Sequence, residues 1–177
     1  KTTNGGINFS FVSIFENYSL NIITGSDSQN MYVMGNYFAE DSTAVFKYIG
    51  SDTVWSNVLR VKGTYNDMSF CNSLTGIVCG NNGKILRTTN GAVSWDSSVV
   101  SGNALLGVQM NNLTNGYIVG TMGTILKTTN SGTSWSLQNS PVASLLNDVY
   151  VMSADDLGFI VGGSGRILKT TNGGTTA

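Results

Sequence analysis

Short apolar segments enclosed by glycines recur along the chain, and a second apolar segment follows each of them. The enclosed segments run from Gly76 to Gly80, from Gly116 to Gly120 and from Gly158 to Gly162. The second segments centre on the pairs Ile85-Leu86, Ile125-Leu126 and Ile167-Leu168. Apolar runs of this length with turn residues on both sides, and with no 3.6-residue period, predict short antiparallel β-strands.

A polar motif follows each second apolar segment. It reads Thr128-Thr129-Asn130-Ser131-Gly132-Thr133-Ser134-Trp135, and copies begin at Thr88, at Thr170 and at Thr2, where Phe9 takes the place of tryptophan. Asn can bond backbone groups ahead of it, Gly permits positive φ, and the hydroxyls tie the ends together, so the motif predicts a turn sealed by an aromatic ring. The residues given this structural role are Thr88, Asn90, Trp95, Thr128, Asn130, Gly132, Trp135, Thr170, Asn172 and Gly174.

The tryptophans set the repeat length. Trp55, Trp95 and Trp135 are 40 residues apart, and the next is expected near position 177, where Ala177 stands. A period of about 40 with several strands per unit is typical of propeller blades. We therefore expect an all-β fold, a β-propeller or propeller segment of four blades with about four antiparallel strands each. It forms one domain over residues 1–177, with a partial unit at 1–15 and full units at 16–55, 56–95, 96–135 and 136–177.

Both ends of the sequence fall at the same place in the repeat, because residues 1–6 and 169–174 are identical. This favours a segment of a longer propeller, and the alternative is a compact four-bladed ring closed by the N-terminal strand.

The polar motif resembles the Asp-box, or bacterial neuraminidase repeat, with Asn in place of the usual Asp. Its surroundings, Gly116–Gly120 and Gly123–Asn130, are similar to the repeats of the photosystem II assembly-factor-like propellers, many of which are secreted bacterial proteins. The resemblance implies an Asp-box propeller. It leaves function open, because Asp-box propellers include sialidases, xyloglucan-cleaving hydrolases, sorting receptors and assembly factors. Sialidase chemistry would need a cluster of three arginines, and the chain has only Arg60, Arg87 and Arg166. Arg87 and Arg166 lie in the repeated segment just before the turn motif, so they are not expected to converge on one site.

The composition excludes several function classes. Charged residues make up 11% of the chain and the net charge is −1, so no basic surface is available for nucleic acid. No apolar run approaches the roughly 20 residues that span a bilayer, so no membrane insertion is expected. The chain has no histidine, which excludes Ser-His and Cys-His nucleophiles and His-based metal sites. No cofactor and no metal are expected.

The two cysteines bear on the question of which cellular compartment the protein occupies. Cys71 and Cys79 are expected on adjacent strands of one hairpin, where they could form a disulfide or remain buried thiols. A disulfide would fit an oxidising compartment, and the resemblance to secreted proteins also points to an extracytoplasmic location: secreted, cell-surface or periplasmic.

Two groups of residues are candidate sites. Asp67 and Asp148 occupy the same register at the start of inner strands, where they are weak catalytic candidates for glycoside hydrolysis; the alternative is that each caps a turn through its own backbone. The second group lies on an insertion at 36–43, because Gly35 and Trp55 are 20 positions apart whereas Gly80 and Trp95 are 15 apart. It offers rings and acids to a sugar or a protein: Tyr37, Phe38, Glu40 and Asp41. The alternative is that Phe38 folds onto the blade and the acids form a solvated tip.

The resulting hypothesis is a non-catalytic recognition or scaffold propeller of a secreted or cell-surface bacterial protein. Its partner would be a protein or a glycan, bound on the face that carries the insertion. The alternatives are part of an Asp-box glycoside hydrolase and, from the resemblance alone, an assembly factor for a membrane complex.

Overall fold

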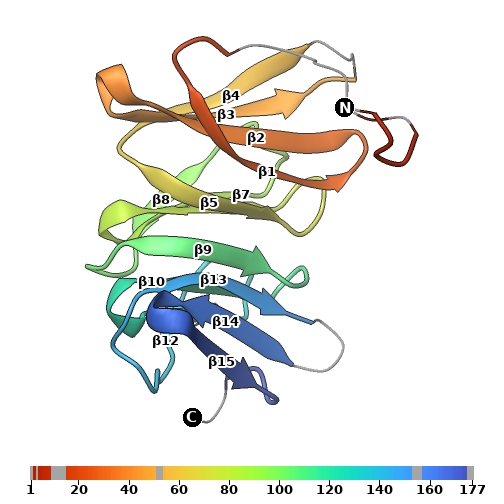
Figure 1. Cartoon of the computed structure of the whole chain (residues 1–177). Helices are drawn as coiled ribbons and strands as arrows, with labels where there is room; N and C mark the ends of the chain where they lie inside the picture. Colours follow the sequence, from red (N-terminus) through yellow and green to blue (C-terminus); the bar gives the residue numbers. More distant parts are fainter. Residues whose placement is uncertain (1, 3, 9–14, 51–53, 153–156, 175–177) are drawn as a thin grey trace.

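The protein folds into four small antiparallel β-sheets stacked in a row (Figure 1). The structure is a computed structural model that describes residues 2, 4–8, 15–50, 54–152 and 157–174, without the side chain of Phe38. Each sheet is a blade whose strands lie in sequence order. The predicted all-β propeller fold with four blades is confirmed.

The blades have similar strands. The first contains β1 (Ser19–Asp27), β2 (Asn30–Tyr37), β3 (Ser42–Tyr48) and β4 (Trp55–Lys62). The second contains β5 (Tyr65–Phe70), β6 (Gly76–Gly80), β7 (Lys84–Thr88) and β8 (Asp96–Val99). The third contains β9 (Leu105–Met110), β10 (Gly116–Gly120), β11 (Ile125–Thr128) and β12 (Ser136–Leu137). The fourth has three strands among the described residues: β13 (Leu146–Val151), β14 (Gly158–Gly162) and β15 (Arg166–Thr170).

The second and third strands of each blade are joined by a short 3₁₀ turn. These turns are η1 (Phe38–Glu40), η2 (Asn81–Gly83), η3 (Thr121–Gly123) and η4 (Gly163–Gly165). Among the described residues no helix is long and apolar enough to cross a membrane.

The inner strands β1, β5, β9 and β13 pack side by side at the front of Figure 1. Each has a register shift near its start, between Leu20 and Ile22, Tyr65 and Asp67, Leu105 and Gly107, and Leu146 and Asp148. Such a bulge re-aims the next side chain. The same bulge therefore brings Asp67, Gly107 and Asp148 into one row across three blades.

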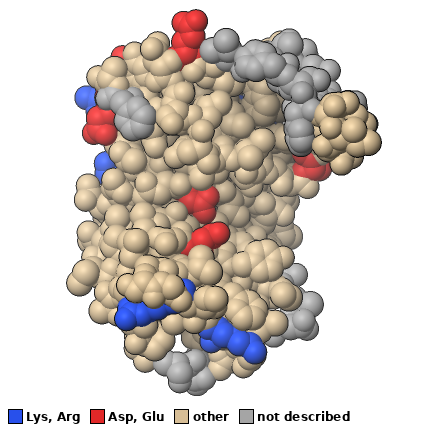
Figure 2. Space-filling model, in the orientation of Figure 1, with Lys and Arg blue, Asp and Glu red and all other residues tan. Residues whose placement is uncertain are grey.

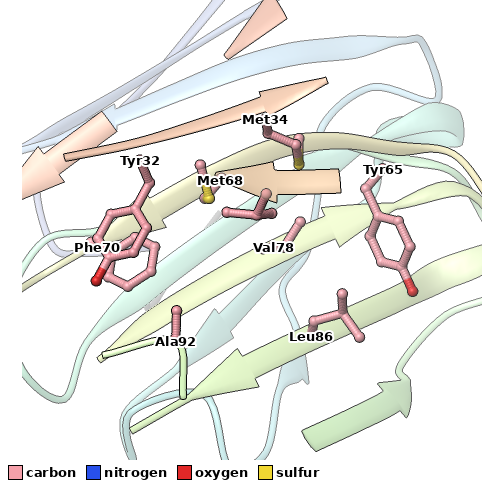
Figure 3. Close-up of a cluster of buried hydrophobic side chains, with 9 residues drawn as sticks. Tyr32, Met34, Tyr65, Met68, Phe70, Val78, Leu86 and Ala92 are labelled. Atoms are coloured by element: carbon pink, nitrogen blue, oxygen red, sulfur yellow. The ribbon is translucent and has the colours of Figure 1, made fainter. Parts of the chain in front are cut away.

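The cores lie between blades. Figure 3 shows the first, where β2 of one blade meets β5, β6 and β7 of the next. The rings of Tyr32 and Phe70 are stacked there, with centroids 3.9 Å apart. A second core joins the second and third blades through Ile77, Cys79 and Ile85, and a third joins the third and fourth through Tyr117 and Val119. Burial of these side chains is the main force that holds the blades together.

The polar motif forms the predicted turn between third and fourth strands. In the third blade the Thr128 hydroxyl donates to Asn130 Oδ1 (3.0 Å) and accepts from the Gly132 amide (3.0 Å). The Asn130 side chain in turn accepts from the Ser134 amide (2.9 Å). The same pattern holds Thr88 to Asn90 and Thr170 to Asn172. The turn satisfies its own polar groups, as its sequence indicated.

Polar contacts between blades repeat as well. The basic residue just before a turn motif, or its counterpart in the first blade, donates to a backbone carbonyl in the next motif along the chain. The pairs are Lys47 Nζ to Gly91 O (3.2 Å), Arg87 Nε to Ser131 O (2.6 Å) and Lys127 Nζ to Gly173 O (2.7 Å). These periodic cations are therefore structural links from one blade to the next.

Both cysteines are free thiols. Cys79 is fully buried in the core between the second and third blades, and burial raises the pKa of its thiol well above the usual range. Of the two interpretations of the pair, the one with unbridged thiols describes the structure, so the cysteines carry no argument for an oxidising compartment.

Candidate functional site

The insertion lies at the predicted residues 36–43, in the hairpin formed by β2 and β3. Three residues lie between Gly80 and Lys84, where β6 ends and β7 begins, whereas eight lie between the corresponding Gly35 and Ala44 in the first blade. The added residues lengthen the β2–β3 hairpin by two pairs, Asn36 with Thr43 and Tyr37 with Ser42. The predicted loop is thus an ordered extension of the hairpin, closed by η1.

The extension is anchored at the start of the next inner strand. The Thr43 hydroxyl accepts a hydrogen bond from the Tyr65 amide (3.1 Å) and lies 2.8 Å from Gly63 O. The Asp41 carbonyl accepts from the Gly63 amide (2.7 Å). The insertion therefore shares a face with the beginning of the inner strand β5.

A surface cluster sits on this hairpin, formed by Tyr37, Glu40 and Arg60. The Arg60 guanidinium forms an ion pair with Glu40 and lies 5.3 Å from the centre of the Tyr37 ring. The Tyr18 ring also contacts Tyr37, at 5.3 Å between centroids. Two of the predicted binding residues, Tyr37 and Glu40, therefore meet around an arginine that sequence reasoning did not include. The side chain of Phe38 lies outside the described residues, and Asp41 contributes a turn with φ of 44°.

The two aspartates lie on either side of Gly107 in the inner-strand row. A Cβ at Gly107 would stand 3.3 Å from an Asp148 carboxylate oxygen, and the Val108 amide donates to Asp67 Oδ2 (2.7 Å). The other oxygen of Asp67 accepts from the Met68 amide (2.8 Å), and Asp148 likewise accepts from the Val149 amide (2.8 Å). Asp67 thus bridges two blades, while Asp148 holds the same position on the fourth blade and is exposed.

Burial sets the charge state of Asp67. It raises the pKa of this carboxyl from its ordinary value near 4 to about 6, against the opposing effect of the two amide hydrogen bonds; the nearby Asp148 charge adds to the rise. A raised pKa and a second carboxylate nearby suit general acid catalysis. However, both Asp67 oxygens are engaged by backbone amides, which fits a structural bridge at least as well.

The raised pKa predicts a pH-dependent stability. Between about pH 4 and pH 6 the folded chain retains a proton on Asp67 that the unfolded chain releases, so Asp67 makes the free energy of unfolding fall as pH rises. The fall attributable to Asp67 is at most about 3 kcal/mol. Urea unfolding from about pH 4 to about pH 7 measures it. In Asp67→Asn most of this slope should vanish, whereas Asp148→Asn should keep most of it; an unchanged slope in Asp67→Asn would refute the assignment.

The outward face of the fourth blade is exposed, unlike its counterparts. Ile85, Ile125 and Ile167 occupy one register, opposite Cys79, Val119 and Val161, yet their exposed fractions are 1%, 8% and 70%. Lys169 differs from its counterparts in a similar way. It occupies the position at which Arg87 and Lys127 donate a hydrogen bond to a backbone carbonyl of the next blade. It forms no hydrogen bond or ion pair with the described residues. Figure 2 shows basic side chains at this lower end of the molecule.

A cavity of about 310 Å³ lies beside β15, between the third and fourth blades. Its wall includes Val151, Gly158, Thr170 and Gly174. In the second blade the same positions are Phe70, Gly76, Thr88 and Ala92, and Trp95 packs against the core formed there, with its ring 6.2 Å from that of Phe70. The cavity therefore corresponds to the position that the motif tryptophan occupies in the second blade.

Comparison with known proteins gives a family match and several structural matches. Residues 49–138, just over half of the chain, match the sequence family described as photosynthesis system II assembly factor YCF48. The matched part covers the second and third blades. No curated protein sequence matches the chain.

Three solved structures illustrate the structural similarity. YCF48 bound to a D1 peptide aligns with a TM-score of 0.57 and 24% identity, over 64% of this chain and 39% of that one. YCF48 from Cyanidioschyzon merolae gives 0.66 and 16%, over 85% and 50%. The GH74 enzyme of Niastella koreensis gives 0.65 and 19%, over 88% and 29%. The chain thus spans half or less of each of these proteins, and at these identities the likeness concerns the fold.

Proposed function

The chain belongs to the family of the photosystem II assembly factor YCF48, and we propose that it is a non-catalytic propeller that binds a segment of another protein and acts as an assembly scaffold. The family match across two whole blades carries the proposal. A YCF48 structure was solved with a D1 peptide, which supports a polypeptide rather than a glycan as the kind of partner.

The contact surface in this proposal is the cluster of Tyr37, Glu40 and Arg60. Tyr and Arg are the residues that contribute most often to binding hot spots, and here they are held in place by stacking and by the ion pair. Arg60 keeps 46% of its side chain exposed. The cluster projects from an otherwise regular scaffold, which is where binding residues concentrate.

The hydrolase alternative has less support. The GH74 similarity is one of fold, and fold does not carry activity. The backbone hydrogen bonds on Asp67 leave neither of its oxygens free of a partner. Extracytoplasmic location is part of the proposal and rests on the resemblance to secreted propellers; fractionation of cells expressing the full gene product would test it.

Selection from a random peptide display library against the purified chain tests the protein-binding function. We expect a consensus peptide that binds saturably, whereas a glycan array and a xyloglucan hydrolysis assay give no signal. Tyr37→Ala should weaken the selected peptide roughly tenfold or more. Tyr150→Ala, which alters an exposed tyrosine on the fourth blade, is the matched control and should bind normally. Failure to enrich any peptide, or glycan binding instead, would overturn the function; a peptide insensitive to Tyr37→Ala would overturn its location.

A further inference from the structure

Two exposed apolar side chains distinguish the third blade from the second. Met122, the middle residue of η3, is 69% exposed and stands where η2 has the exposed Asn82. Leu137 of β12 is 73% exposed, in the register where β8 has the exposed Ser97. The second and third blades both have a blade on either side (Figure 1), and these positions are exposed in both. Their exposure therefore belongs to the repeat, whereas the apolar side chains belong to the third blade alone.

The fold does not require a methionine in η3. Asn82, Met122 and Ser164 are the middle residues of their turns and have nearly the same backbone angle, with φ of 57°, 56° and 60°. The left-handed conformation is sterically unfavourable for most side chains, whereas Asn adopts it more readily. A methionine here thus costs stability and gains little burial in return. Residues that oppose a local rule in this way occur most often at functional sites.

Met122 and Leu137 lie on the walls of one surface groove of about 520 Å³. Residues 138–143, in the linker from β12 to β13, form most of the remaining wall. The linker is tied to η3, because the Gly123 amide donates a hydrogen bond to the Ser144 carbonyl (2.8 Å). A groove held by the backbone in this way is preformed, which lowers the entropic cost of binding.

The chemistry of the lining selects the kind of group that can bind. No charged and no aromatic residue is among the described residues that line the groove. A charged group would lose its hydration there without meeting an opposite charge, and a sugar ring would find no aromatic face to stack on. The flexible side chain of Met122 adapts to apolar partners. Asn139, at the exposed rim, forms no hydrogen bond with the described residues, so its carboxamide is available to a peptide group.

We propose that this groove binds a large uncharged apolar side chain of a polypeptide segment, with Asn139 bonded to the backbone of that segment. The inference rests on the proposed protein-binding function and deepens it, since it specifies what the partner presents. The groove lies on the same face as the insertion, because η1 and η3 both join the second strand of a blade to its third. Its volume of about 520 Å³ is within the range of ligand pockets and has room for one large side chain and the backbone that carries it.

A double variant that copies the second blade tests the site. Met122→Asn with Leu137→Ser replaces both apolar side chains by the residues at the same positions of the second blade, so the melting temperature should stay the same or rise. Ala143→Glu, at an exposed position of the groove wall, introduces a charge without altering either residue. Val93→Thr is the matched control, because it removes an exposed apolar side chain from the opposite face and copies Thr133 of the third blade.

A random peptide display library, selected on the chain and depleted on the double variant, supplies the probe. We expect the enriched peptides to share one large apolar residue with uncharged neighbours. The most enriched peptide, labelled with fluorescein, should bind the unaltered chain and Val93→Thr equally in fluorescence polarisation. The double variant and Ala143→Glu should bind it roughly tenfold or more weakly, and replacing its apolar residue by alanine should have a similar effect.

Methyl NMR of methionine-labelled protein gives an independent readout. The chain has six methionines, and the signal of Met122 is the one missing from the spectrum of the double variant. The peptide should shift this signal and leave that of Met34, fully buried between the first and second blades, in place.

The outcomes separate this site from the function as a whole. If selection without depletion enriches peptides and selection with depletion does not, the groove is wrong while protein binding stands. Enriched peptides without a shared apolar residue, or an unshifted Met122 signal, would also overturn the groove. A clear loss of melting temperature in the double variant would overturn it as well, because the two side chains would then serve the fold. If neither selection enriches a peptide, the proposed function fails and the groove fails with it.

Discussion

Gly83→Ala should remove about 4 kcal/mol or more of the free energy of unfolding, whereas the same change at Gly165 should remove about 1–2 kcal/mol. Both glycines end a 3₁₀ turn and have nearly the same backbone angle, with φ of 67° and 69°. Each substitution places an L-residue in the left-handed region, so the conformational strain is the same in both. The difference comes from the space around each position.

A Cβ at Gly83 would stand 1.8 Å from the backbone oxygen of Ser101, whereas a Cβ at Gly165 would meet nothing within 4 Å. The Gly83 carbonyl also accepts a hydrogen bond from the Val100 amide (2.9 Å), so the two segments cannot separate without losing it. Urea unfolding followed by tryptophan fluorescence measures both variants. Equal losses would mean that the close approach of these two segments does not exist in solution.

The repeat could be predicted because its signals are local. The turn motif depends on hydrogen bonds between residues two to four positions apart, such as Thr128 to Asn130, and these follow from the sequence alone. The 40-residue spacing of the tryptophans then predicted blades of several short strands. The insertion was also located by counting, since Gly35 and Ala44 enclose the additional residues.

The contacts between blades could not be predicted in the same way. Asp67 was weighed as a catalytic acid or as a cap of its own turn, and the structure shows it bonded both to its neighbour Met68 and to Val108, 41 positions away. Arg60 pairs with Glu40 across two strands, 20 positions apart. Such contacts depend on how one blade or strand stacks on another, which local patterns do not specify. The sequence nevertheless contained one periodic signal for contacts between blades, namely the basic residue that stands before each turn motif.

The exposure of the outward face of the fourth blade also could not be predicted from the sequence. Ile167 follows the same pattern as Ile85 and Ile125, so periodicity alone predicts that it is buried. Its exposure depends on whether another element packs against that face, which is a property of the whole arrangement.

Truncating this isoleucine in successive blades should therefore give unequal losses of stability. Ile85→Ala should cost about 2–5 kcal/mol, because the side chain is 1% exposed in the core between the second and third blades. Ile125→Ala, at 8% exposure, should fall in the same range or just below it. Ile167→Ala, at 70% exposure, should change the free energy of unfolding by no more than about 0.5 kcal/mol.

The series compares one residue type, one register and one substitution, so side-chain entropy is matched across it. The positions differ in the neighbouring blade and in the outer strand, because β7 and β11 pair with β8 and β12 while β15 pairs only with β14 among the described residues. Chemical denaturation at several protein concentrations gives the three values and shows whether any depends on concentration. A loss at Ile167 as large as that at Ile85 would mean that the face is covered in solution. If that loss grew with protein concentration, the covering element would be a second copy of the chain.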